Sequence, residues 1–204
     1  MYLANKLVKK TKGLMFYKLL GTGAGAGFSL FPDFKTYSLL CVWKDDKSAN
    51  EFLNNSTHSF QISQKAFSRN DYFLKPIHSH GKWDGINPFP ISNNNLNTDL
   101  PLAIITRATL NYSKLFEFWN SVPKASKAIK NAKGVKWFKG IGELPFVQQA
   151  TFSIWDNLES VKDFAYKNAD HSEIVKKTKK RKWYKEDLFS RFVVLGKKTK
   201  LFSN

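Results

Sequence analysis

The chain contains four histidines, the side chains best able to bind iron or move a proton near neutral pH. They are His58, His78, His80 and His171. The intervals between Phe164, His171 and Val175 place all three on one face of a continuous helix. A histidine on such a face either bonds a carbonyl within the core or ligates a haem iron in an apolar cavity. The spacing alone favours the core role.

His78 and His80 flank Ser79 in a segment that we predict to be a loop. On an extended chain the two rings face the same side, as two metal ligands would. No carboxylate or third histidine stands beside them in the sequence. We therefore expect a contact with substrate or with an anion resembling a haem propionate, or two solvated rings, rather than a mononuclear metal site.

Arg107 lies within the apolar segment IITRATL, which we predict to be a strand. A charge in such a strand costs free energy unless it is paired or faces a ligand. Two alternatives stay open, an ion pair with Glu143 or Asp163, and a contact with an anionic cofactor group. No Ser-His-Asp order, phosphate-binding loop or paired-carboxylate motif indicates a nucleophile.

The glycine-rich segment GTGAGAG follows the strand predicted at residues 14–20. It partly matches the dinucleotide-binding pattern G-x-G-x-x-G/A, which requires a helix directly after the glycines. The residues that follow contain Pro32 and then an extended apolar run. We therefore predict a loop that joins two strands and borders a ligand at most.

The elements around these residues occur twice. Two glycine pairs share one spacing and two Trp–Phe pairs share another, and the first copy has an insertion around its glycine-rich segment. The pairs are Gly13 with Gly21, Gly134 with Gly142, Trp43 with Phe52, and Trp155 with Phe164. Repeated spacing of this kind indicates an internal duplication. It predicts that Trp43 is equivalent to Trp155 and Phe52 to Phe164.

The second copy reads as β-α-β-β-α-β, the ferredoxin-like pattern, with one long helix predicted over Glu159–Lys180. The first copy reads as α-β-β-α-β, without a first strand. We predict an α+β protein made of tandem ferredoxin-like halves, in the manner of a dimeric α/β barrel. The halves span residues 1–91 and 102–204, and a polar linker spans 92–101.

The formal net charge is +17, from 33 Lys+Arg and 16 Asp+Glu. Such a charge is typical of proteins that bind nucleic acid, an anionic membrane surface or anionic substrates. The lysines are scattered, and the run Lys176–Lys182 is typical of a solvated helix face.

The single cysteine, Cys41, excludes an intramolecular disulfide and is expected to be buried and inert. No segment has the length of a membrane span or the pattern of a signal peptide. We therefore expect a cytoplasmic protein, in peripheral contact with the inner membrane face.

Several segments carry a resemblance to a known family. They are FYKLLGTGAGAGFSLFPDFKTYSLLCVW, HSHGKWDGINPF, LAIITRATL, GIGELPFVQQATFSIWD and FAYKNADHSEIVKKTKKRKWYKEDLFSRFVVL. Together, from about residue 12 to residue 195, they resemble the spheroidene monooxygenase family of carotenoid oxygenases. The resemblance implies a ferredoxin-like, dimeric α/β-barrel fold. It also implies a haem-dependent monooxygenase that acts on a hydrophobic substrate, an acyclic carotenoid.

The resemblance also implies roles for single residues. His171 becomes the proximal ligand of haem b and thus the metal ligand. Arg107 binds a propionate or orients a group on the distal side, and His78, His80 and Trp83 border the pocket. We take Arg107 and His80 as the catalytic candidates. A redox partner protein supplies electrons, because no nicotinamide or flavin site is evident, and the protein forms a homo-oligomer.

The alternative is a non-catalytic ferredoxin-like module that binds RNA or another anionic partner through its sheet. That function requires an aromatic-rich motif on a central strand. KGLMFYKL and KGVKWFKG begin with Lys-Gly and lack the rest. Nucleic acid is therefore not the favoured partner.

Overall fold

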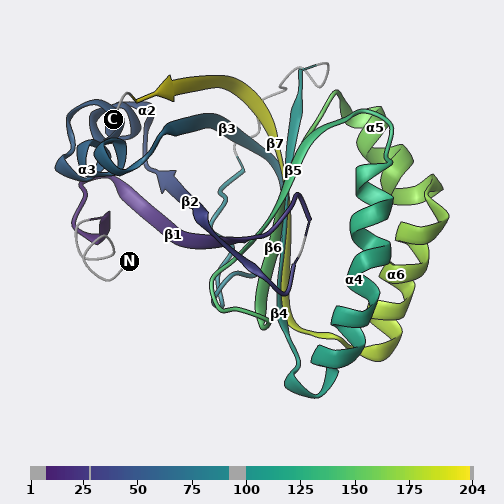
Figure 1. Cartoon of the computed structure of the whole chain (residues 1–204). Coiled ribbons are helices and arrows are strands. Elements are labelled where there is room, and N and C mark those ends of the chain that lie inside the picture. The colour runs from purple at the N-terminus through teal and green to yellow at the C-terminus, as the bar shows by residue number, and fades with distance from the viewer. Residues whose placement is uncertain (1–7, 28, 92–99, 203–204) are drawn as a thin grey trace.

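Seven antiparallel strands form one curled sheet in the order β2-β1-β5-β6-β4-β7-β3 (Figure 1). The structure is a computed structural model that describes residues 8–27, 29–91 and 100–202. The strands are β1 Leu14–Gly23, β2 Pro32–Trp43, β3 Ser68–Gly81, β4 Leu102–Leu110, β5 Val135–Gly142, β6 Gln148–Trp155 and β7 Tyr184–Leu201. The α+β class is therefore as predicted.

Two groups of helices accompany the sheet. The first group is α2 Asp46–Asn55 and α3 Thr57–Lys65. The second is η1 Tyr112–Lys114 (3-10), α4 Leu115–Lys130, α5 Leu158–Lys162, η2 Asp163–Lys167 (π) and α6 Ala169–Arg181. Figure 1 shows α4, α5 and α6 on one side of the sheet, and α2 and α3 at its far end. None of the described helices is long and apolar enough to cross a lipid bilayer.

A helix that begins at Lys47 was expected to continue toward Phe67, but the segment contains two helices, because Ser56 ends one and begins the next. Its backbone is extended (φ −78°, ψ 137°), and its amide donates to the carbonyl of Phe52 at the end of α2. Its hydroxyl accepts a hydrogen bond from the Ser59 amide at 2.9 Å, which caps α3. The expected continuation of a single helix toward Phe67 was therefore wrong.

The long helix predicted over Glu159–Lys180 is also interrupted. A π-helical segment, η2, follows α5, and Asn168 then leaves the helical conformation with ψ 111° before α6 begins. The helical phase therefore does not continue from Phe164 to His171, so the premise of one unbroken helix was wrong, and the shared face of the two residues stays a prediction. Val175, the third member of that face, is 39% exposed. By contrast, α4 runs unbroken through Pro123, whereas separate helical stretches were expected at Ser113–Trp119 and Pro123–Ala132.

Strand β3 extends to Gly81, so His78 and His80 lie in a strand rather than in the predicted loop. Because both are held against β7, their rings are positioned by sheet pairing and not by a free loop. The glycine-rich segment behaves as expected. It joins β1 to β2 in a hairpin, with Gly23 opposite Pro32 and no helix among its described residues.

The sheet has an inner face and an outer face, which we define by their apolar clusters. The inner face carries buried residues such as Leu20, Ile105 and Phe192, drawn from both halves of the chain. The outer face carries Leu102, Ile104, Val193 and their neighbours, which pack against α4, α5 and η2. Alternate residues of β4 and β7 therefore point into different clusters, as strand geometry requires.

The second half has the ferredoxin-like strand order β5-β6-β4-β7, whereas the first half supplies only three strands. Its β2 and β3 form the two edges of the sheet. The two halves also contain matching ring pairs. The rings of Trp43 and Phe52 lie 5.1 Å apart at 42°, and those of Trp155 and Phe164 lie 5.2 Å apart at 37°. The division at residues 92–101 stays a prediction, because residues 92–99 lie outside the described part of the chain.

Candidate functional site

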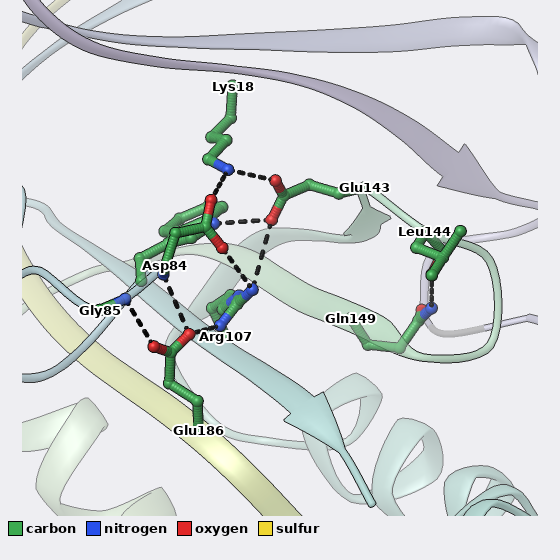
Figure 2. Close-up of polar contacts among 9 residues, drawn as sticks. Lys18, Asp84, Gly85, Arg107, Glu143, Leu144, Gln149 and Glu186 are labelled. Atoms are coloured by element: carbon green, nitrogen blue, oxygen red, sulfur yellow. Dashed lines mark hydrogen bonds and ion pairs between the residues drawn. The ribbon is translucent and has the colours of Figure 1, made fainter. Parts of the chain in front are cut away.

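Arg107 of β4 is almost fully buried, with 1% of its surface exposed, and three carboxylates surround its guanidinium group. Its Nη2 lies 3.3 Å from Asp84 Oδ1 and 3.6 Å from Glu143 Oε1, while Nη1 donates to Glu186 Oε1. Figure 2 shows these side chains converging on the guanidinium group. Of the alternatives left open for Arg107, the ion pair with Glu143 is therefore present. Asp163 pairs instead with Lys167, at 2.7 Å.

The turn that follows β3 holds this cluster together. Trp83 is fully buried and its indole Nε1 donates to Glu143 Oε1 at 2.6 Å. The backbone amides of Asp84 and Gly85 donate to the two oxygens of Glu186, at 3.0 and 2.7 Å (Figure 2). Asp84 has a φ of 54°, which its short polar side chain tolerates. The segment KWDG is thus a turn fixed by Glu143 and Glu186.

Lys18 of β1 adds a second cation, which contacts both Asp84 and Glu143. Burial opposes its charge, but the hydrogen bonds with those two carboxylates outweigh burial and raise the pKa of Lys18. Burial likewise opposes the charge of Glu186. The amides of Gly85 and Asp84, together with Arg107, outweigh it and lower the pKa of Glu186.

Three carboxylates and two cations therefore pair with one another on the inner face, although Arg107 Nε is buried without a hydrogen-bond partner. An anion that approached Arg107 would meet Asp84, Glu143 and Glu186 as well, all of them negative. This environment favours the ion-pair alternative for Arg107 over a contact with an anionic cofactor group. The cluster chiefly positions Trp83 and its turn, and the Arg107 guanidinium stacks on the Trp83 ring at 5.5 Å.

His78 and His80 lie together on the outer face, at the β3 edge. His80 Nδ1 is 3.3 Å from His78 Nε2, and both rings contact Phe189 of β7, with centroids 6.1 and 5.4 Å away. Partial burial lowers the pKa of His78, and the positive charges of Arg191 and His80 lower it further. The lowered pKa favours the neutral form of His78, in which one ring nitrogen donates and the other accepts a hydrogen bond.

Arg191 is a residue that the sequence analysis missed. It lies in β7 directly opposite His78, it is half-buried, and its Nε is buried without a hydrogen-bond partner. The signal that singled out Arg107, a charge within an apolar strand, was also present in SRFVVL.

The predicted site residues therefore occupy two faces. Arg107 and Trp83 meet on the inner face, whereas His78 and His80 meet on the outer face beside Phe189. His171 lies in the first turn of α6, but its side chain lies outside what the structure describes. Within the described residues, no three His, Cys, Asp or Glu side chains form a cluster that could hold a metal ion.

A cavity of about 580 Å³ lies beside the glycine-rich loop, which was expected to border a ligand at most. Its lining residues are Gly25, Ala26, Thr36, Lys130, Val135, Lys136, Trp137, Phe138 and Lys139. Lys139 also donates to the Gly25 carbonyl at 2.7 Å, which fixes the loop against β5. None of the predicted site residues lines this cavity.

Three curated proteins named spheroidene monooxygenase are similar to the chain. The protein from Cereibacter sphaeroides is 37% identical over 183 residues, which cover 89% of this chain and 56% of that protein. The protein from Rubrivivax gelatinosus is 31% identical over 90% of this chain and 70% of its own length. The protein from Rhodobacter capsulatus is 29% identical over 96% and 82%. The chain thus spans little more than half the length of the first of these relatives.

No protein-family model matches the chain. Among solved structures, a candidate monooxygenase from Fusobacterium nucleatum matches 98% of this chain and 84% of its own, with 13% identity and a TM-score of 0.47. A candidate monooxygenase from Lactobacillus acidophilus matches 97% and 87%, with 8% identity and a TM-score of 0.43. With scores below 0.5, these likenesses decide nothing further about the chain.

Proposed function

The chain belongs to the spheroidene monooxygenase family, and we propose that it is itself an oxidoreductase that inserts one oxygen atom into a hydrophobic substrate. The observation that carries this proposal is the 31% identity with the Rubrivivax gelatinosus protein over 70% of that protein's length. The matched segment covers 90% of this chain, so it includes most of the strands and their residues on both faces of the sheet. The substrate class that best fits the relatives' name is an acyclic carotenoid.

Haem b is the proposed cofactor, and the outer face offers side chains that fit it. The imidazoles of His78 and His80 lie there beside Phe189, near the unpartnered Nε of Arg191. We propose His171 of α6 as the iron ligand, with His78 and His80 bordering the pocket. The activation of dioxygen would come from the bound haem, while the protein supplies an apolar surface and orientation.

Inner-face residues have a different proposed task. Arg107 and Trp83 hold the turn after β3, and they thereby fix the end of the strand that carries His78 and His80. We therefore propose a positioning role for Arg107 and keep His80 as the candidate that contacts the reacting groups. Electrons would come from a separate redox partner, and the charge of +17 suits an anionic partner or membrane surface.

An absorption spectrum after expression with added haem tests the cofactor. We expect a Soret band in the wild type, and its loss or a strong shift in His171→Ala with an unchanged far-ultraviolet circular dichroism spectrum. His58→Ala is the matched control, since His58 lies in α3, and its Soret band should persist. A colourless wild type that binds RNA with a steep salt dependence would replace this proposal with the binding module.

The activity itself is tested by turnover with a chemical reductant and ¹⁸O₂. An acyclic carotenoid should gain a single labelled oxygen atom, whereas label arriving only from H₂¹⁸O would exclude a monooxygenase. Chromatography with mass detection measures both outcomes. If His80 contacts the reacting groups, His80→Gln should lower the rate of incorporation more than it lowers the Soret absorbance, whereas equal losses would assign His80 to cofactor binding.

A further inference from the structure

Arg191 differs from the other three arginines of the chain, each of which pairs with a carboxylate. Arg69 pairs with Asp71 at 3.0 Å, Arg107 with three carboxylates, and Arg181 with Glu117 at 2.9 Å. No carboxylate among residues 8–27, 29–91 and 100–202 forms an ion pair with Arg191. Arg191 lies on the outer face opposite His78, so its guanidinium group is available to pair with an anionic ligand.

Partial burial of this unpaired cation costs free energy. The side chain is half-buried, and its Nε is shielded from solvent without a hydrogen-bond acceptor. Burial lowers the pKa of the guanidinium group, and only Tyr166 of η2 acts in the opposite direction. A buried donor on a cation that lacks an acceptor is unfavourable unless a ligand provides one.

The described neighbours of Arg191 add further hydrogen-bond donors. His78 is its partner in the β3–β7 register, and His80 touches His78 with a nitrogen–nitrogen distance of 3.3 Å. The apolar ring of Phe189 contacts both imidazoles, edge-on for His78 and stacked for His80. The carboxylate of Asp163 in η2 is occupied by Lys167, at 2.7 Å.

We infer that Arg191, His78 and His80 form a binding site for an oxyanion on the outer face of the sheet. The planar edge of a guanidinium group matches the two oxygens of a carboxylate or phosphate, and imidazole N–H groups supply further donors. Arg107 shows the contrast, since it has the same functional group but is enclosed by carboxylates. The oxyanion has two candidate sources, a carboxylate of a porphyrin or a free phosphate group.

Titration with inorganic phosphate at low ionic strength tests the site without any cofactor. Saturable binding should be seen by calorimetry, and the ring resonances of His78 and His80 should shift. Arg191→Gln should weaken binding about tenfold or more, since charge-assisted hydrogen bonds are lost, and Arg191→Lys should retain part of it. Arg181→Gln removes the same charge at an exposed arginine and should bind as the wild type does.

Two results would overturn the site: wild-type protein that does not bind phosphate, or equal weakening in Arg181→Gln and Arg191→Gln, which would indicate only the general positive charge. Unaltered circular dichroism spectra exclude misfolding of either variant.

A second arm identifies the source and rests on the proposed haem function. It compares the affinity for haem with that for haem dimethyl ester, whose carboxylates are blocked. If Arg191 receives a porphyrin carboxylate, the wild type should prefer haem about tenfold, and Arg191→Gln should lose the preference. Equal affinities would assign the site to free phosphate. If neither form binds, the haem proposal fails, while the phosphate titration still decides the oxyanion site.

Discussion

Gly21 of β1 and Gly142 of β5 are paired with each other at the junction between the two predicted halves of the chain. Each lies the same distance after an earlier glycine, Gly13 or Gly134, that adopts a positive φ of 80° or 81°. Only one further pair, Thr22 with Ile141, joins β1 to β5. The junction between the predicted halves is therefore short, and its two glycines occupy the positions that the predicted duplication makes equivalent.

The two glycines should nevertheless respond differently to substitution. A Cβ added at Gly142 would lie 2.7 Å from the Gln148 carbonyl oxygen, whereas one at Gly21 would meet nothing closer than 3.9 Å. Gly142→Ala should therefore lower the free energy of unfolding by about 1–3 kcal/mol, as overpacking does, and Gly21→Ala should change it little. Urea denaturation measures both, and equal effects would show that the steric account is wrong.

Removal of Arg107 should be strongly destabilising. Arg107→Met leaves Asp84, Glu143 and Glu186 with Lys18 as the sole cation, so we expect a loss of about 3–5 kcal/mol in the free energy of unfolding. Adding Glu186→Gln should restore part of the loss, because one uncompensated charge is then removed. Arg181→Met is the control at an exposed ion pair and should have little effect. A small loss in Arg107→Met would mean that water or a ligand compensates the cluster.

His58 should make the protein less stable in acid. It is 5% exposed, neither ring nitrogen has a hydrogen-bond partner among the described residues, and burial lowers its pKa below 6.5. Between the folded and unfolded pKa values the unfolded chain binds more protons, so stability falls as pH falls below about 6.5. His58→Phe should flatten this dependence. His78, whose pKa is also lowered, contributes to the slope that remains.

The control for His58→Phe is the free energy of unfolding at about pH 8, where both imidazoles are neutral. There the variant should be as stable as the wild type if the phenyl ring fits beside Phe52, whose ring lies 6.0 Å from that of His58. An unchanged slope between about pH 6.5 and 5 would exclude His58 as the cause.

Cys41 should be almost unreactive in the folded protein. Burial raises the pKa of its thiol to about 12, so very little thiolate exists near neutral pH. Reaction with a coloured disulfide reagent at pH 8 should be more than about a hundredfold slower than in urea. Cys41→Ser should not react in either state. Rapid reaction of the native protein would place the thiol in a more open environment.

Local signals in the sequence predicted much of the fold. Pro32 and the extended run after the glycines correctly indicated a hairpin, and the apolar segment IITRATL correctly indicated β4. The break at Asn168 follows η2, in which Phe164 packs against the Trp155 ring of β6. Because that contact joins two different elements, the local sequence could not predict it. The inner-face cluster was equally hidden, since Arg107 and Glu186 lie 79 residues apart in the sequence.

The candidate site was predicted in its residue types better than in its arrangement. A charge in an apolar strand was noticed at Arg107, and the same reasoning applied to Arg191 would have found the unpaired arginine. Arg107 has carboxylate partners because the tertiary structure brings Asp84, Glu143 and Glu186 beside it. That information is tertiary, and no spacing along the chain contains it.

The two edge strands, β2 and β3, have a consequence for how the protein behaves at high concentration. Each presents backbone N–H and C=O groups that, within the described residues, no further strand covers, and such an edge can recruit strands from other molecules. Both edges bear features that oppose this. Pro32 begins β2, while Pro76 and two register shifts interrupt β3. These irregularities should keep neighbouring molecules from joining edge to edge into fibrils, and replacing Pro76 would remove one such barrier.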